Sequence, residues 1–600
     1  MRLNPVKSLG ITLMVLSSIL LALALFLLAM TQPHFGTPVA NWALAKWGPD
    51  GARVERANVK FPAITTVVAS GLDLPDRLNA QSLEARVNIF GFLPFVSWIA
   101  RLESADGYIR LDGQSSGEGD ATISDYRAVV DDIVLSGIEI RLGRERGPDT
   151  ILLEEARGSL RSGALMIRAK GAGSELRFNG TSTNSLSAIE GKLIIAGDNF
   201  ADVASLVGLA APDTPPYNVR MSVAIRDQTW RLDFEPDTRV GDSDMSGKVR
   251  VDLNGDTPTV DADLYSSSLD ADDLGIVFGI PIGVGEDETV GTEQTRAREA
   301  YNRSSRLIPA VEIDFSRLDA VDGTINFEAR EVVDSVFDIQ SLQLNFEIEG
   351  RVVRAPLVMV GFSDGSIDAY ATIDGTRSPA VTTVEGNLNE VPMDSLALSP
   401  YARGHAEGRF KVEATGDGFR QAADQLNGSA AFWSTDADIL ALAVEGAALD
   451  LVEALTVLGE PADDRSYVEA RCLAVVVEFA DGIGSFAPAV IDTDDSLVVV
   501  RGEVGLGTER LKLSVRSDAK DASLGTLIGD VGIGGTLRNP EIQPFSAQTV
   551  AQFGLVGILA SLSGGLAALP FIEPGAASDA PCGALLNRAQ TASEESAVSN

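Results

Sequence analysis

The chain has 600 residues, too many for one ordinary compact domain unless the fold grows by repetition along one axis. Hydrophobic residues make up 45% of the chain and charged residues 22%, a composition that supplies a large buried surface and is not that of a disordered chain. The 85 acidic side chains outnumber the 48 basic ones and give a formal net charge of −37, which argues against binding to nucleic acid and indicates a solvated acidic outer surface.

The first predicted element is the run from Leu9 to Met30, which is 22 residues without a charge. As a helix it reaches roughly 33 Å, enough to cross a bilayer core of about 30 Å. The residues after it make a poor cleavage site, so we predict an uncleaved signal anchor over 9–30. Arg2 and Lys7 precede it, which predicts that residues 1–8 are cytoplasmic and that the bulk of the chain is translocated.

After the anchor, apolar and polar residues alternate in many short runs, as in β-strands with one apolar face. The clearest runs cover 219–225, 249–253, 311–315, 325–329, 342–348, 367–373, 410–414 and 511–515. Turn pairs follow or separate them, namely Asn254-Gly255, Asp322-Gly323, Asp364-Gly365, Asp374-Gly375 and Asp481-Gly482. The pattern predicts an all-β fold built on a long antiparallel meander.

Few segments read as helices. We expect helices at 202–209, at 439–458 and at 547–569; the last is very apolar but interrupted by glycines, so 546–572 is predicted to be an amphipathic or plug-like segment. The polar segment 283–306 is predicted to be a linker between β-regions at 31–282 and 307–545. The tail 573–600 is predicted to be flexible.

The alternation also predicts which side chains share the apolar face. Eleven are expected to line it: Val223, Ile225, Val251, Ile325, Phe327, Leu344, Phe346, Ile373, Phe410, Val412 and Leu513. Their neighbours Asn326, Asn345 and Lys411 should point the other way. Alternation alone leaves two choices open: several sandwiches in series with dry cores, or one long sheet curled into a trough whose wall solvates acyl chains.

The chain has only two cysteines, Cys472 and Cys582. In an oxidising compartment they can form a disulfide, and we predict that this bond ties the apolar segment 547–569 back onto the sheet. The alternative, two unrelated buried thiols, stays open at this point.

The sequence contains few of the residue patterns that catalytic or metal-binding sites require. The only histidines, His34 and His405, lack metal-ligand spacing, and no Gly-x-Ser-x-Gly elbow is present. The run from Gly241 to Asp244 is interpreted as a turn, and the acidic residues Asp492, Asp494 and Asp495 as a solvated turn rather than a calcium loop. We therefore expect no catalytic residue, no cofactor and no metal, and a protein that is not an enzyme.

Several short strand-and-turn features occur in a characteristic order along the chain. They include Ser70-Gly71-Leu72, Leu206-Val207-Gly208-Leu209, the runs 240–247 and 263–270, Asn427-Gly428-Ser429, and the run 534–540, which ends in Arg538-Asn539-Pro540. In this order the chain resembles the AsmA family of Gram-negative envelope proteins, from the anchor to about residue 585, with a departure at the acidic insert after Ile282.

The resemblance implies an anchor in the bacterial inner membrane that carries an elongated, hydrophobic β-groove in the periplasm. It favours the trough over the sandwiches, and a role in outer-membrane biogenesis in which phospholipid passes along the groove between the membranes. The expected partners are phospholipids, the inner membrane through residues 9–30, and outer-membrane or envelope proteins, but no nucleic acid. The alternative function is a structural or assembly factor that supports the targeting and assembly of outer-membrane proteins without carrying lipid.

Overall fold

The fold was analysed in a computed structural model of the chain. With short gaps inside several ranges, it describes residues 18–47, 51–110, 130–271, 273, 292–309, 315, 321–440, 467–520, 523–524, 531–543, 572–573 and 577–595. The chain divides into two compact units, Met1–Val240 and Gly241–Asn600, so the boundary precedes the linker expected at 283–306. Each unit is described by itself.

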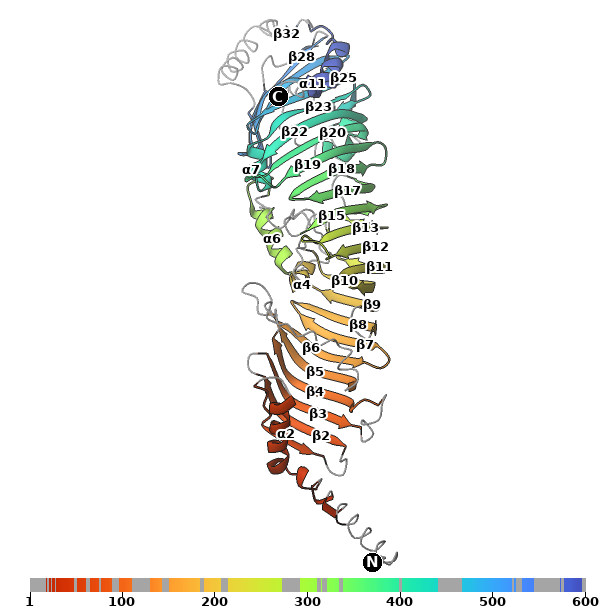
Figure 1. The fold of residues 1–600 in the computed structure, drawn as a ribbon. Helices are drawn as coiled ribbons and strands as arrows, with labels where there is room; N and C mark the ends of the chain where they lie inside the picture. The colour runs from red at the N-terminus through yellow and green to blue at the C-terminus, as the bar shows by residue number, and fades with distance from the viewer. Residues whose placement is uncertain are drawn as a thin grey trace, which may run out of the picture. The chain divides into compact units, whose positions relative to one another are not determined.

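The N-terminal unit is a curved sheet with one helix docked at its first strand (Figure 1). Its elements are α2 (Pro33–Trp47), β1 (Arg56–Val59), β2 (Thr66–Leu74), β3 (Leu78–Val87), β4 (Ile99–Arg110), β5 (Val130–Arg141), β6 (Thr150–Ser159), β7 (Ala164–Gly171), β8 (Ser174–Ser182), β9 (Ala188–Gly197), α4 (Phe200–Leu206), β10 (Tyr217–Arg226) and β11 (Thr229–Val240). Consecutive strands pair antiparallel except β4 and β5, which are parallel.

The C-terminal unit is a longer sheet of the same kind. Its strands are β12 (Ser243–Asp252), β13 (Thr259–Ser266), β14 (Leu269–Asp270), β15 (Asp322–Ala329), β16 (Val332–Val333), β17 (Ser341–Glu349), β18 (Val352–Gly361), β19 (Ser366–Asp374), β20 (Val381–Pro392), β21 (Ala402–Arg403), β22 (His405–Thr415), β23 (Asn427–Ser434), β24 (Asp438–Leu440), β25 (Tyr467–Ala480), β26 (Ile483–Thr493), β27 (Ser496–Gly505), β28 (Arg510–Ala519), β29 (Ser523–Leu524), β30 (Val531–Gly535), β31 (Pro540–Gln543) and β32 (Ile572–Glu573). Its helical elements are α6 (Thr292–Arg303), the π-helical turn η2 (Asp394–Leu398), α7 (Phe419–Asp424) and α11 (Cys582–Glu595).

The predicted turn at Asp481-Gly482 shows how local sequence sets the register. Asp481 and Gly482 both have positive φ angles, 47° and 72°, the two-residue hairpin geometry that Asp-Gly favours. Ala480 therefore pairs directly with Ile483, and β26 folds back on β25. The turn expected at Asp322-Gly323 is wrong, because these residues begin β15 and pair with β13.

The all-β prediction with few short helices is confirmed, but a purely antiparallel meander is wrong. Besides β4–β5, the pairs β13–β15 and β14–β16 are parallel. Parallel neighbours need a long connection, and the chain supplies one in residues 111–129 and another in residues 271–321.

Three further expectations need correction. The linker expected at 283–306 contains the helix α6, and the tail expected to be flexible contains the helix α11. The helix expected at 439–458 is wrong at its start, because Ile439 and Leu440 pair with β25 as part of β24, while 441–458 lie outside the described residues. The helix expected at 202–209 is found as α4.

The segment 547–569 lies outside the described residues.

The predicted anchor at 9–30 falls only partly on described residues, since 9–17, 19, 20, 23 and 27 lie outside them. The described residues from 18 to 30 are helical. In the part of the chain that the structure describes, no helix combines the length and the apolar character needed to cross a membrane.

Candidate functional site

The strand pairing in the C-terminal unit aligns apolar side chains into a continuous row across the sheet. Residues that pair directly on neighbouring strands share a face. Following the pairs from β12 to β26 gives the row that we call the Leu344 row: Gly247, Leu264, Phe327, Leu344, Val358, Ala369, Gly386, Phe410, Ala430, Val477 and Phe486. No charged or polar side chain interrupts it.

A second apolar row runs beside the first on the same face, two residues away along each strand. It begins with Ala329, Leu342, Val360, Ile367 and Leu388 and continues to Val475, Val500, Val515 and Val531. Its first members, Ala329 and Leu342, are buried in a small cluster with Leu269. The two rows together make a wide apolar face.

The side chains of the Leu344 row are not sealed in a core. Leu344, Phe327, Val358 and Phe410 are each half-buried, as are the remaining members apart from Gly386. Part of this face is covered: Phe327 and Leu344 pack against the cluster that contains Leu269, and Val475 and Val515 of the second row pack against the core cluster that contains Met393 and Ala406. Half-burial in the described residues is the pattern of a wall that faces an accessible space.

The opposite face of the same strands is polar. The row beside Leu344 on that face runs Lys248, Asp263, Asn326, Asn345 and Leu357. Asn326 Nδ2 donates to Asp263 Oδ1 at 2.7 Å, and two strands further on Lys411 Nζ lies 3.1 Å from Glu385 Oε2. Exposed pairs of this kind add little stability. The polar side chains indicate that this face is in contact with solvent.

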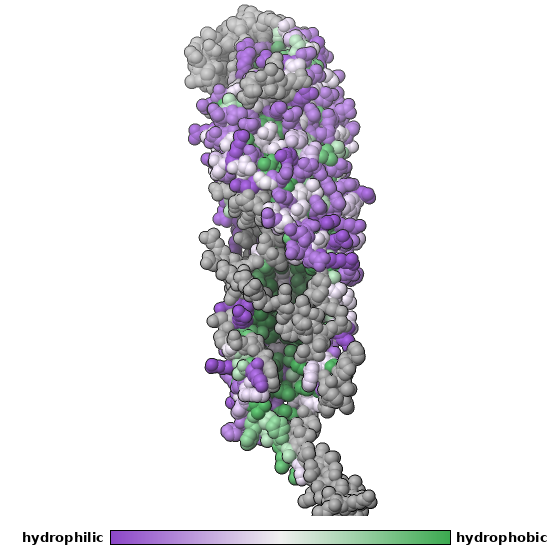
Figure 2. All heavy atoms as spheres, viewed as in Figure 1, coloured by the Kyte–Doolittle hydropathy of each residue, from purple (hydrophilic) through white to green (hydrophobic). Residues whose placement is uncertain are grey.

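The N-terminal unit repeats the arrangement. Its longest apolar row is Leu72, Ala80, Gly107, Ile138, Leu153, Ala169, Leu176, Ile195 and Val219. Figure 2 shows apolar side chains gathered in a hollow on the inner side of this unit, with polar side chains at its rims. Where Gly180 and Gly191 face each other, the ring of Phe178 lies over both, and a Cβ at either glycine would meet its Cζ at 2.7 Å.

A hollow of about 660 Å³ lies near the C-terminal end of the second sheet. Leu511, Leu513, Ile533 and the bare backbone of Gly502 line it, and the pairing of Gly502 with Leu513 and of Leu513 with Ile533 places all three on one face. The volume falls in the range of about 300–1,000 Å³ that small-molecule sites occupy. Arg501, Arg510 and Lys512 also line the hollow, so its wall is apolar in part and basic in part.

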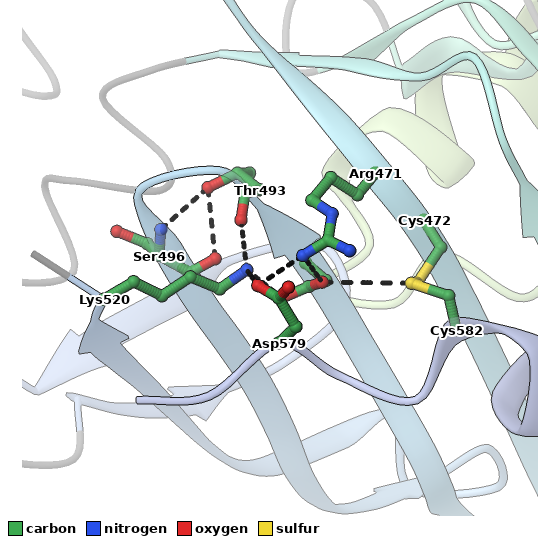
Figure 3. A network of polar contacts seen from close by, with 8 residues as sticks. Arg471, Cys472, Thr493, Ser496, Lys520, Asp579 and Cys582 are labelled. Atoms are coloured by element: carbon green, nitrogen blue, oxygen red, sulfur yellow. Dashed lines mark hydrogen bonds and ion pairs between the residues drawn. A yellow bond between two sulfur atoms is a disulfide. The ribbon is translucent and has the colours of Figure 1, made fainter. Parts of the chain in front are cut away.

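A buried ion-pair network fixes α11 to the other face of the sheet (Figure 3). Asp492 in β26 is 0% exposed, and its Oδ1 lies 2.8 Å from Lys520 Nζ, which also lies 2.8 Å from Asp579 Oδ1. Arg471 Nη1 pairs with Asp579 and lies 3.6 Å from Asp492 Oδ2. Burial lowers the pKa of Lys520, but hydrogen bonds to both carboxylates outweigh it, so the pKa is raised overall.

Cys472 in β25 and Cys582 at the start of α11 form a disulfide beside this network, with Cα atoms 5.9 Å apart. The bond closes a loop of 110 residues, which in the chain-entropy model contributes up to about 4.7 kcal/mol. Leu585, Leu586 and Ala589 of α11 pack on Trp433 and its neighbours. The bond therefore ties α11 to the sheet, on the face away from the Leu344 row. The segment 547–569, which this bond was expected to hold on the sheet, lies outside the described residues.

The turn at 241–244 leads into a buried hydrogen-bond cluster around Asp273. Ser243 Oγ donates to Asp273 Oδ2 at 2.6 Å and accepts from the backbone N–H of Asp270 at 2.9 Å. Burial raises the pKa of Asp273 to about 6, against hydrogen bonds from Ser243 and Asp242 that lower it. Neither histidine lies here: His405 in β22 has its Nδ1 2.8 Å from Asp436 Oδ2, a bond that raises the pKa of His405.

In a search of the described residues, the group with metal-ligand proximity is Cys472, Asp492 and Cys582, whose sulfurs are bonded to each other. Disulfide sulfurs are not thiolates, so they are not ligands in this state. Asp494 and Asp495 are exposed beside the buried Asp492.

The predicted lining residues lie on the apolar faces as follows. Val223 and Val251 are buried, and the other nine, Ile225, Ile325, Phe327, Leu344, Phe346, Ile373, Phe410, Val412 and Leu513, are half-buried. Val223 and Ile225 belong to the N-terminal unit and the rest to the C-terminal unit. Sequence reasoning missed Val358, Ala430 and Val477 as members of the Leu344 row, although each stands in an alternating or apolar run that could have shown it.

Comparison with known proteins gives two matches. Residues 160–485 match the family model of the AsmA family. The "AsmA family protein YhjG" of Escherichia coli (strain K12) is 22% identical over 451 residues, which cover 71% of this chain and 65% of the relative, a little under two thirds of its length. No solved structure matches.

Proposed function

The chain belongs to the AsmA family, and from this membership and the partly exposed apolar face we propose that it is a non-catalytic, inner-membrane-anchored periplasmic protein that carries phospholipid between the inner and outer membranes. The anchor is the apolar run at 9–30, and the lipid path is the face that carries the Leu344 row. The observation that carries the proposal is the half-burial of this continuous row.

The size of the row supports several lipids rather than one. Eleven strands spaced about 4.8 Å apart span about 48 Å. One acyl chain spans about half of the 30 Å bilayer core, or about 15 Å. Together with the second row it forms a contiguous, partly exposed apolar face, and such patches mark lipid or protein binding sites. A face of this length suits a path better than a pocket.

The polar outer face and the charge of the chain are compatible with a lipid on the apolar face. The polar face and the net charge of −37 keep the outside of each sheet in water. On the apolar face, a lipid gains about 0.8 kcal/mol for each CH₂ removed from water while its head group stays at the open edge.

Native mass spectrometry of the full chain, extracted in a mild detergent, tests the proposal. We expect several phospholipids on each chain. The double variant Leu344→Asp, Phe410→Asp should lose them, while Leu357→Asp, on the polar face of the neighbouring strand, should keep them. Repeated absence of lipid from the wild-type chain would refute the proposal and favour an assembly factor for outer-membrane proteins.

A further inference from the structure

The helix α2 is docked on the first strand by a side that carries both polar and apolar side chains. The backbone N–H of Ala57 donates to Thr37 Oγ1 at 3.0 Å, and Asn41 exchanges two hydrogen bonds with the backbone of Val54, at 2.9 and 3.1 Å. Ala40 and Leu44 pack against the small core of this region. At Gly36 a Cβ would meet the carbonyl oxygen of Ala57 at 2.2 Å, so only glycine allows this close approach. One side of the helix is therefore fixed.

The other side of α2 is apolar and exposed. Phe35, Val39 and Trp42, at positions i, i+4 and i+7, are 54%, 43% and 55% exposed. A helix on the surface of a soluble protein normally has polar side chains on the side that faces water. Lys46 lies one turn further on the same side, with its Nζ 5.2 Å from the ring centroid of Trp42.

The exposed apolar surface continues toward the N-terminus. Leu21, Leu25, Phe26 and Leu28 are all more than half exposed, and they belong to the uncharged run at 9–30. Of the 15 large hydrophobic side chains that are exposed in the described part of the chain, seven lie between Leu21 and Trp42. Apolar exposure is thus concentrated here.

Charge identifies what covers this surface. The chain has 85 acidic side chains, yet the first of them is Asp50, and the residues between the predicted anchor and Asp50 carry His34 and Lys46. A segment without acids in a strongly acidic chain is complementary to an anionic surface. Trp and Lys are also the side chains that sit at the boundary between acyl chains and head groups, where the ring is buried and the ammonium reaches the phosphates.

We propose that the exposed side of α2, formed by Phe35, Val39 and Trp42, lies in the head-group boundary of an anionic phospholipid bilayer as an interfacial helix. At 15 residues α2 is about 22 Å long, too short to cross the bilayer but long enough to lie on it. Because the opposite side of α2 holds β1, the helix fixes the first strands of the N-terminal sheet against the membrane surface. The inference extends the proposed function and rests on it only for the presence of a membrane.

Photo-crosslinking of the full chain in vesicles of phosphatidylethanolamine and phosphatidylglycerol tests the proposal. A photoreactive residue at 39 or 42 should crosslink to phospholipid. Position 194 is the matched control, because Ile194 is an apolar side chain of the same unit, 37% exposed on β9, and it should not react with lipid. The double variant Val39→Asp, Trp42→Glu should reduce lipid crosslinking from position 35 by at least about tenfold without changing proteolytic stability, since both side chains point outward.

The outcomes separate this proposal from the proposed function. Lipid at 39 and 42 but not at 344 would support the interfacial helix and refute the lipid path. Lipid at 344 with none at 39 and 42 would refute the interfacial helix, as would crosslinks from 39 and 42 to a second copy of the chain or to another protein. Equal lipid crosslinking in vesicles of phosphatidylcholine alone would refute the part assigned to Lys46.

Discussion

Replacing Leu344 by Asp distinguishes an open apolar wall from a dry core. Full burial of a leucine side chain contributes about 1.5–3 kcal/mol, so the half-buried Leu344 contributes about 1–1.5 kcal/mol. On an open face the new carboxylate reaches water, and the variant should lose no more than about 2 kcal/mol of unfolding free energy. In a dry core an unpaired buried charge would be added to the lost packing, for a total above about 4–5 kcal/mol.

Leu357→Asp is the matched control, because it makes the same chemical change on the adjacent strand. Leu357 is 38% exposed and pairs with Asn345 on the polar face, whereas Leu344 pairs with Val358 on the apolar face. Its replacement should cost less than about 1 kcal/mol.

Hydrogen exchange of the β17 amides measures the stability of both variants, and photo-crosslinking from 344 and 357 measures lipid contact. We expect Leu344→Asp to accumulate but fail to protect the outer membrane against detergents. In separate chains that carry a photoreactive residue in place of Leu344 or Leu357, only position 344 should crosslink to lipid. The reasoning is refuted if Leu344→Asp unfolds while Leu357→Asp is stable, or if both positions crosslink lipid equally.

Two further predictions concern buried charges in the C-terminal unit. Lys520→Met leaves the carboxylate of Asp492 with Arg471, 3.6 Å away, as its remaining cation, and should lower the free energy of unfolding by about 3 kcal/mol. The loss should appear as faster amide exchange in α11 and β25, and adding Asp492→Asn should restore most of the stability. Wild-type amide exchange in Lys520→Met alone would contradict the role of the network. The pKa of Asp273 is raised to about 6 in the folded chain, so the contribution of this carboxyl group to stability is greatest below pH about 4 and falls as pH rises through 6. The free energy of unfolding should fall by about 3 kcal/mol in all, and by about 1 kcal/mol between pH 5 and 7. Asp273→Asn should remove this part of the pH dependence of unfolding, and an unchanged dependence would show that the wild-type carboxyl titrates normally.

The sequence predicts the strands well because their signal is local. The alternation over 342–348 gives β17, and the Asp-Gly pair at 481–482 gives the hairpin between β25 and β26, since both depend on neighbouring residues only. The parallel pairs could not be predicted from periodicity, which says that a strand exists but not which strand lies beside it. Only the lengths of the connections, 111–129 between β4 and β5 and 271–321 between β14 and β15, hinted at a crossover.

The helix α11 was missed for a different reason. Its apolar stripe is short, Leu585, Leu586 and Ala589, and the helix depends on packing against Trp433 and Val476, which are more than a hundred residues away in the sequence. The position of Cys582 just before this stripe was the one available signal. The Leu344 row also depends on long-range information, because the bulges between Asn345 and Glu347 and between Ala355 and Val358 decide which side chains align.

Passive movement along such a wall follows from the balance of apolar contacts. A lipid that leaves a bilayer for the Leu344 row exchanges one apolar surrounding for another, so most of the 0.8 kcal/mol per CH₂ is retained. A wall on one side leaves about half of each acyl chain uncovered, which costs about 0.4 kcal/mol per CH₂ for an isolated lipid. Neighbouring lipids cover one another and remove much of this cost. Loading should therefore be cooperative, and native mass spectra should show chains that are empty or filled, whereas a spectrum dominated by chains with one lipid would indicate a single pocket instead of a path.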